Sequence, residues 1–152
     1  MTKLLVVVLL AFAAAPFAAN GAGCDVHQIR GTYSTSCQGF MSPAAGVYVP
    51  IAAIGVQSSD SDGKFNGTGH VSIGGQQLEE RFENGTPELN DDCSGTITYK
   101  ITLVTPQGEV AQPDQTFAFV VLDHGDRIRS IDIDDGQTAS CLLERISTAP
   151  VR

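Results

Sequence analysis

Hydrophobic and polar residues alternate with a period of two over most of the chain after residue 23. The clearest case is residues 96–103, where the odd positions are apolar and the even positions are polar. Residues 65–73 alternate in the same way, with Gly67 and Gly69 on the apolar face. Because successive side chains of a strand point to opposite faces, this pattern predicts β-strands with one buried and one exposed face.

Further strands are predicted at residues 31–40, 47–56, 77–84, 116–123, 127–132 and 139–146. Turn-forming sequences separate the strands, at residues 60–63, 84–87, 124–125 and 134–136. Roughly eight strands with short connections predict an all-β fold, a single antiparallel barrel whose closure removes the exposed sheet edges. A two-sheet β-sandwich is the alternative, and the hairpin-like connections favour the barrel.

The N-terminus has the pattern of a secretory signal peptide. Lys3 precedes an apolar run over residues 4–12, and small residues follow up to Gly23. The run is shorter than the roughly 20 apolar residues that span a bilayer, and no second stretch is longer, so we expect no membrane span. We predict a signal peptide at residues 1–23, a barrel domain at 24–146 and a frayed tail at 147–152. The protein is then secreted or periplasmic, with a lipid anchor through Cys24 as a minor alternative.

The four cysteines all lie after the predicted signal peptide. An even number of cysteines in an exported chain predicts disulfides, and four cysteines allow three pairings. In an up-and-down barrel the first and last strands are neighbours, which favours Cys37 with Cys141. Cys24 and Cys93 would then fall at the same end of the barrel.

The charge balance excludes one class of partner. The whole chain has a net charge of −8, with 17 acidic residues and only 9 scattered Lys and Arg. So acidic a surface repels phosphate backbones, and we expect no nucleic-acid binding. The three histidines are far apart and the cysteines lack paired spacing, so we expect neither a metal site nor an organic cofactor.

Three inward-facing polar residues are candidates for catalysis. Glu80 shares the face of Leu78 and Phe82, where burial would raise the pKa of its carboxyl and suit it to general acid–base chemistry. Tyr33 and Tyr99 also fall on inward faces, where their hydroxyls could orient a ligand or stabilise an enolate-like intermediate. The ordinary interpretations are that both tyrosines are core residues, and that Glu80 turns outward or pairs with Arg129.

The predicted ligand contacts are an apolar wall and one basic residue. Ile128 is out of phase with Ile131 and Ile133, which predicts a β-bulge near Arg129. Such a bulge would turn Arg127 or Arg129 to the barrel mouth, where it could meet a ligand carboxylate; an ion pair at the rim with Asp123 or Asp132 is the alternative. The apolar wall would consist of Val71, Ile97, Ile101, Phe117 and Phe119.

Several segments together resemble a known family. These are residues 31–34, 54–55, 62–69, 72–75, 90–99, 121–123 and 128–131, of which the Asp92–Cys93–Ser94–Gly95–Thr96–Ile97–Thr98 run is the most specific. They resemble the small exported barrels grouped with the allene oxide cyclase-like domains, which are related in shape to dirigent proteins and lipocalins. The resemblance implies an eight-stranded barrel with an apolar interior that steers the cyclisation or coupling of small molecules without a cofactor. The catalytic residues of the plant cyclases do not map onto this sequence.

The sequence therefore leads to one main functional hypothesis and one alternative. The main hypothesis is a secreted barrel that encloses a small apolar molecule, either to bind it or to steer its cyclisation or isomerisation. Whether it is an enzyme stays open, as do the ligand and the oligomeric state. The alternative is a structural or protein-interaction barrel with a filled core.

Overall fold

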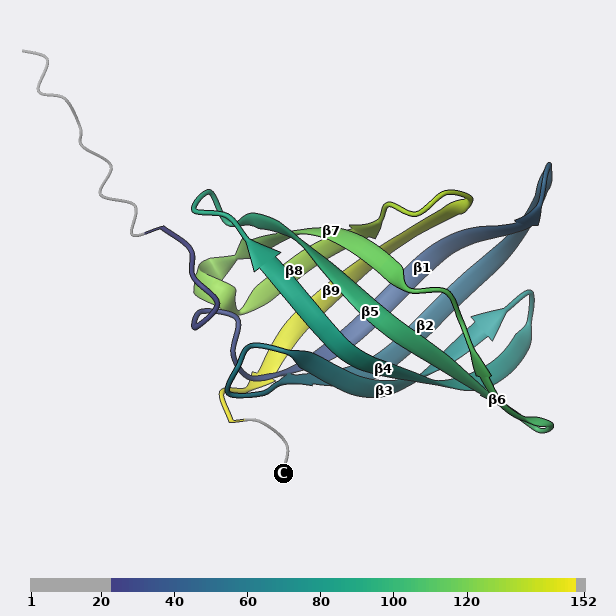
Figure 1. The fold of residues 1–152 in the computed structure, drawn as a ribbon, viewed down its shortest axis with the longest axis horizontal. Coiled ribbons are helices and arrows are strands. Elements are labelled where there is room, and N and C mark those ends of the chain that lie inside the picture. The colour runs from purple at the N-terminus through teal and green to yellow at the C-terminus, as the bar shows by residue number, and fades with distance from the viewer. Residues whose placement is uncertain (1–22, 150–152) are drawn as a thin grey trace, which may run out of the picture.

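A computed structural model describes residues 23–149, so all but the last residue of the predicted signal peptide lies outside the described part. The chain forms nine β-strands and one short 3₁₀ turn (Figure 1). The strands are β1 (Thr32–Ala44), β2 (Val47–Ser59), β3 (Phe65–Ile73), β4 (Gln76–Leu89), β5 (Ser94–Thr105), β6 (Gly108–Ala111), β7 (Gln115–Leu122), β8 (Arg127–Asp132) and β9 (Gln137–Ser147), and the turn η1 (Asp123–Gly125) lies between β7 and β8.

Eight of the strands close into an antiparallel barrel. The hydrogen-bonded order is β4-β3-β2-β1-β9-β8-β7-β5, and a further pairing of β4 with β5 closes the ring. The predicted eight-stranded barrel is confirmed. The short strand β6 was not predicted; it folds back on the end of β5, where Gly108 turns the chain with a φ of 125°.

The predicted turn at residues 84–87 is wrong, because β4 continues through it. Asn84 has a φ of 55°, and the pairing with β5 shifts between Glu83 and Thr86, which is the signature of a bulge inside the strand. Gly85 is required there because a Cβ atom would collide with the ring of Tyr99. Turn-forming residues thus bend a long strand around the barrel instead of ending it.

The predicted bulge near Arg129 is also wrong. Strand β8 pairs with β7 and β9 without a shift in register. Ile128 and Asp132 are buried, whereas Arg129 and Ile131 are exposed. The strand keeps a single phase because the surface tolerates the two outward isoleucines, Ile131 and Ile133, and Arg129 therefore lies on the outer face.

Both predicted disulfides are confirmed. Cys37 and Cys141 are register partners on β1 and β9, and Cys24 and Cys93 join the segment before β1 to the loop after β4. A sulfur atom in a disulfide cannot also carry a thioether-linked lipid. The bond to Cys93 therefore contradicts the alternative of a lipid anchor through Cys24.

The two ends of the barrel are built differently. At the end where the chain enters, which we call the closed end, residues 23–31 cross the opening and Ile29 is buried in the core (Figure 1). The β7–β8 connection with η1 lies at the same end. The other end, which we call the open end, carries the β1–β2, β3–β4 and β8–β9 hairpins and strand β6.

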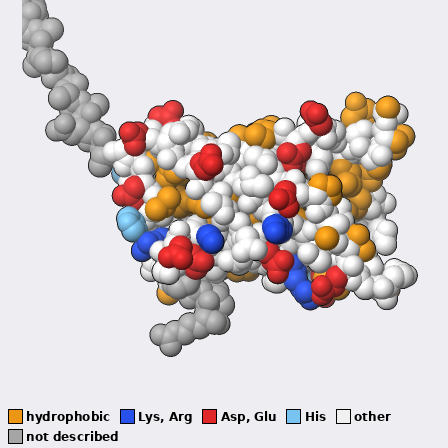
Figure 2. Space-filling model, viewed as in Figure 1, with side chains coloured by type: hydrophobic (Ala, Val, Ile, Leu, Met, Phe, Trp, Pro, Cys, Tyr) orange, Lys and Arg blue, Asp and Glu red, His pale blue; other side chains and the backbone are white. Residues whose placement is uncertain are grey.

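Strands β1 and β2 form a long arm at the open end that has no charge. No charged residue and no histidine occurs between Arg30 and Asp60. Phe40, Val47 and Tyr48 are exposed on this arm, and Figure 2 shows hydrophobic side chains gathered over its tip while acids lie elsewhere on that face. Among residues 23–149, no helix is long and apolar enough to cross a membrane.

Candidate functional site

The barrel interior holds two small cavities. The one toward the closed end has a volume of about 40 Å³ and is lined mainly by Ile29, Phe65, Tyr99 and Phe119. The one toward the open end has a volume of about 80 Å³, and we call it the open-end chamber. Four residues line both cavities and form the partition between them: Cys37, Phe82, Phe117 and Cys141.

The glycines on the inner face of β2 and β3 do not create additional space. A Cβ atom on Gly55 would lie 2.6 Å from the carbonyl oxygen of Thr68, and one on Gly69 would lie 2.7 Å from that of Ile54. These glycines therefore let neighbouring backbones approach closely, which tightens the coiling of the barrel. The interior is consequently narrow.

The open-end chamber combines apolar walls with a few polar groups. Its apolar residues come from seven strands and include Met41, Ile51, Ala53, Val71, Ile73, Ile101, Leu103 and Ala139. Its polar residues are Glu80, Asp132, Gln112, Gln115 and Gln137. No Lys, Arg or His of the described chain is among its lining residues.

Glu80 occupies the inward position on β4 that the sequence predicted. Its side chain is only 6% exposed, and the Oε1 atom has no hydrogen-bond partner within residues 23–149. Gly69 is its register partner on β3, where a Cβ atom would lie 3.1 Å from Oε1 of Glu80. Burial raises the pKa of Glu80 from 4.5 to about 7, so at neutral pH the carboxyl can either give or take a proton.

Asp132 is a second buried acid of the chamber, whereas the sequence analysis considered it only as a partner for Arg129 at the rim. It is 4% exposed, its Oδ1 accepts a hydrogen bond of 2.9 Å from the backbone N–H of Asp134, and burial raises its pKa. The signal was present in the sequence: strict alternation from Ile128 places residue 132 inside. The assumed bulge concealed that signal.

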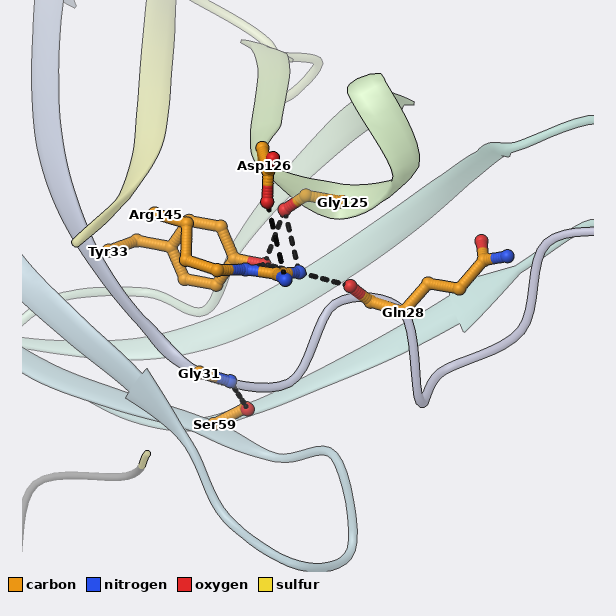
Figure 3. A network of polar contacts seen from close by, with 7 residues as sticks. All are labelled: Gln28, Gly31, Tyr33, Ser59, Gly125, Asp126 and Arg145. Atoms are coloured by element: carbon orange, nitrogen blue, oxygen red, sulfur yellow. Dashed lines mark hydrogen bonds and ion pairs between the residues drawn. The ribbon is translucent and has the colours of Figure 1, made fainter. Parts of the chain in front are cut away.

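Tyr33 belongs to the closed end and not to the chamber. Its hydroxyl donates a 2.8 Å hydrogen bond to the carbonyl oxygen of Gly125 and accepts one of 3.0 Å from Nη2 of Arg145 (Figure 3). The Arg145 guanidinium also lies 5.5 Å from the centre of the Tyr33 ring, a cation–π distance. Burial raises the pKa of Tyr33, although the hydrogen bond and the charge of Arg145 oppose that shift.

Arg145 joins four separate segments at the closed end, and sequence reasoning did not identify it. Besides Tyr33 on β1, it donates to the carbonyl oxygens of Gln28 and Gly125 and lies 3.4 Å from the carboxylate of Asp126 (Figure 3). These contacts occupy the guanidinium of Arg145, and the Arg145 side chain is only 15% exposed. This network therefore serves to lock the entering chain onto the barrel.

Tyr99 is a core residue next to the inner cavity. Its hydroxyl donates a 2.7 Å hydrogen bond to Oε1 of Gln57, and its ring meets those of Phe82 and Phe117 edge to face. Burial raises its pKa. The structure thus does not bring the three predicted catalytic residues together: Glu80 is in the open-end chamber, Tyr99 lines the inner cavity and Tyr33 is in the closed-end network.

The predicted apolar wall divides between the two cavities. Val71 and Ile101 line the open-end chamber, Ile97 and Phe119 line the inner cavity, and Phe117 lines both. Arg129 lines neither of them. The polar and ionisable side chains that share the open-end chamber are Glu80, Asp132 and the three glutamines.

No cluster of three His, Cys, Asp or Glu side chains able to hold a metal ion is found among residues 23–149. No protein-family model, no curated protein and no solved structure matches this chain. An eight-stranded barrel is an architecture that unrelated families share, so the fold does not identify the allene oxide cyclase-like family.

Proposed function

We propose that this protein is a secreted barrel that binds one end of a small, largely apolar molecule in the open-end chamber. The observation that carries the proposal is the Oε1 atom of Glu80, which is buried in an apolar chamber without a hydrogen-bond partner in the described chain. Buried polar atoms in native proteins nearly always have a partner, and exceptions point to function or to a missing bound group. The signal-like N-terminus and the two disulfides support export.

The size of the chamber limits what it can enclose. A volume of about 80 Å³ is roughly half of the 150 Å³ cavity that holds a benzene molecule in a well-studied protein core. The chamber can therefore take the end of a ligand, while the rest of the molecule lies among the hairpins at the rim. Gln112, Gln115 and Gln137 offer hydrogen bonds to the ligand there.

Binding is better supported than catalysis. A cofactor-free cyclisation or isomerisation of the kind that the family resemblance implies would need groups that act on one substrate. The hydroxyls of Tyr33 and Tyr99 are already hydrogen-bonded elsewhere, so Glu80 and Asp132 would have to act alone.

The test compares two substitutions at adjacent positions of β2. Ala53 lines the chamber and Ala52 is exposed on the outer face, so Ala53→Phe fills the chamber while Ala52→Phe adds the same ring outside it. We expect the fluorescence of the neutral dye N-phenyl-1-naphthylamine to rise with the wild type and with Ala52→Phe, and not with Ala53→Phe. Circular dichroism would verify that both variants fold. Equal dye binding by the two variants, or none by the wild type, would contradict the proposal.

The uncharged arm favours a second candidate, an interaction barrel with no ligand. Tyr48 is 73% exposed on the arm, and two copies that met through β1 and β2 would keep their acidic residues apart. This candidate predicts a dimer in sedimentation velocity that Tyr48→Lys converts to a monomer. A wild-type monomer at all accessible concentrations would eliminate it.

A further inference from the structure

The polar groups of the open-end chamber are unbalanced in charge. Two carboxyl groups, Glu80 and Asp132, line the same narrow space, together with the amides of Gln112, Gln115 and Gln137. Within residues 23–149 no basic side chain joins them there. A buried carboxylate normally has a cationic or strongly hydrogen-bonding partner, because removing the charge from water is costly. The chamber therefore holds two acids and neutral amides, and it lacks a cationic group.

An ammonium group supplies what the chamber lacks. It carries one positive charge and three N–H donors, which can be shared among carboxylate and amide oxygens. A carboxylate ligand would instead bring another negative charge into a chamber that already holds two acids. A hydroxyl would fill the hydrogen bond to Glu80 and leave the charge uncompensated. A calcium ion prefers several carboxylate ligands in one coordination sphere, and no cluster of three His, Cys, Asp or Glu side chains able to hold a metal ion is found among residues 23–149.

We propose that the ligand of the open-end chamber is a primary amine on an unbranched apolar chain, with its ammonium group bound by the carboxyl of Glu80 and Asp132 as the second acid of the same chamber. This inference rests on the proposed function, because it names the chemical class of the bound molecule. The apolar walls, among them Val71, Ile101 and Leu103, contact the carbons next to the nitrogen. The rest of the chain leaves through the open end.

The charge of the whole molecule favours the same class of ligand. The net charge of −8 attracts cations over a distance set by the ionic strength. The rate of amine association is therefore expected to fall as salt is added. The rate for an uncharged molecule of the same shape should not change.

Binding of an amine is coupled to the ionisation of Glu80. Asp132 is the other titratable group of the chamber; across the wall, His70, Glu79 and Arg81 project from the outer faces of β3 and β4. Leu103, the register partner of Glu80 on β5, carries no charge. Because the pKa of Glu80 is about 7, an ammonium that favours the carboxylate releases a proton below that pH. Amine affinity should therefore rise between pH 6 and pH 8, a range in which an alkylamine stays protonated.

The experiment uses three probes of equal length: hexylamine, 1-hexanol and hexanoate. Their binding to the full mature protein is measured by NMR titration at pH 8 and at pH 6. At pH 8 we expect hexylamine to bind about tenfold more tightly than 1-hexanol, and hexanoate not to bind. Glu80→Gln should remove the advantage of the amine and leave the affinity for 1-hexanol within about twofold.

Glu79→Gln is the matched control, because it removes the same charge from the adjacent, exposed position of β4. It should leave the affinities for hexylamine and 1-hexanol within about twofold. Asp132→Asn is the second variant in case Glu80→Gln does not fold, and it should weaken hexylamine selectively.

The outcomes separate the two proposals. If 1-hexanol binds as tightly as hexylamine, or if Glu79→Gln weakens the amine as much as Glu80→Gln, the ammonium site is overturned while the binding function stands. If none of the three probes binds and the neutral dye also fails to bind, both proposals fall.

Discussion

The two ends of the barrel each bury an ionisable group, and they treat it in opposite ways. At the closed end, Arg145 is bonded to Tyr33, Gln28, Gly125 and Asp126. At the open end, Glu80 is more deeply buried, yet its Oε1 has no partner among residues 23–149. Burial of an ionisable group therefore does not by itself mark a binding site in this protein. The difference between these two groups is that the hydrogen bonds of Arg145 are made and Oε1 of Glu80 is unpaired; Nε of Arg30, near the closed end, also lacks a partner among residues 23–149.

The difference also has opposite consequences for stability. Filled hydrogen bonds to a charged group contribute to the free energy of unfolding. A carboxyl whose pKa burial raises to about 7 does the reverse, because the folded state is penalised when the group ionises. The open end thus lowers stability at the place where we propose a ligand binds, as binding sites often do.

Removing the partition between the cavities should have the largest effect. Phe117→Ala deletes a ring that contacts both cavities, and loss of a buried phenyl group costs about 4 kcal/mol through lost burial and the cavity left behind. Urea unfolding measures the loss. Val120→Ala, at an exposed position of the same strand, should cost less than about 1 kcal/mol. A similar cost for both would mean that the ring does not fill the interior.

Breaking the closed-end network comes next. Arg145→Ala leaves Tyr33 and two backbone carbonyls without their charged donor, and we expect a loss of about 3 kcal/mol in the free energy of unfolding. The control is Arg129→Ala, which removes the same charge from the exposed face of β8. If the two substitutions cost the same, the network does not lock the entering chain.

The smallest of the three effects has the opposite sign. The pKa of Glu80 is about 7 when folded and near 4.5 when unfolded, so the folded state holds more protons between these values. The contribution of Glu80 to the free energy of unfolding is therefore fully present below pH 4.5 and is lost as the pH rises through 7.

Glu80→Gln should consequently raise the free energy of unfolding by about 2 kcal/mol at pH 8 and change it little at pH 4. The gain at pH 8 is smaller than the full pKa shift implies, because the buried amide still bears part of the cost of leaving water. Urea unfolding at the two pH values measures the gain, with Glu79→Gln as the control. A variant that is less stable than the wild type at pH 8 would show that the carboxylate has a partner in the folded protein.

Local alternation predicted most of the fold because strand periodicity depends only on neighbouring residues. It placed Glu80, Tyr33 and Tyr99 inside, and the adjacency of first and last strands predicted Cys37 with Cys141. The bend within β4 was missed because Asn84 and Gly85 have the same conformational preferences in a turn and in a bulge.

The alternation of hydrophobic and polar residues could not predict which inward-facing side chains lie at the same end of the barrel. Alternation says that a residue faces inward, whereas the end of the barrel at which it lies depends on register and coiling over all strands. Tyr33 and Glu80 share an inward orientation and lie in different regions for this reason. Arg145 was missed because its acceptors, Gln28 and Gly125, are separated from it by 117 and 20 residues.

The two disulfides together overlap along the chain, since one spans residues 24 to 93 and the other spans residues 37 to 141. Any single peptide bond cut between residues 24 and 141 therefore leaves two fragments that at least one bridge still joins. A protease that nicks an exposed hairpin tip, such as the uncharged β1–β2 arm, would release no fragment from the oxidised molecule. In an environment rich in proteases, this chain can be cleaved once and still remain one covalent particle.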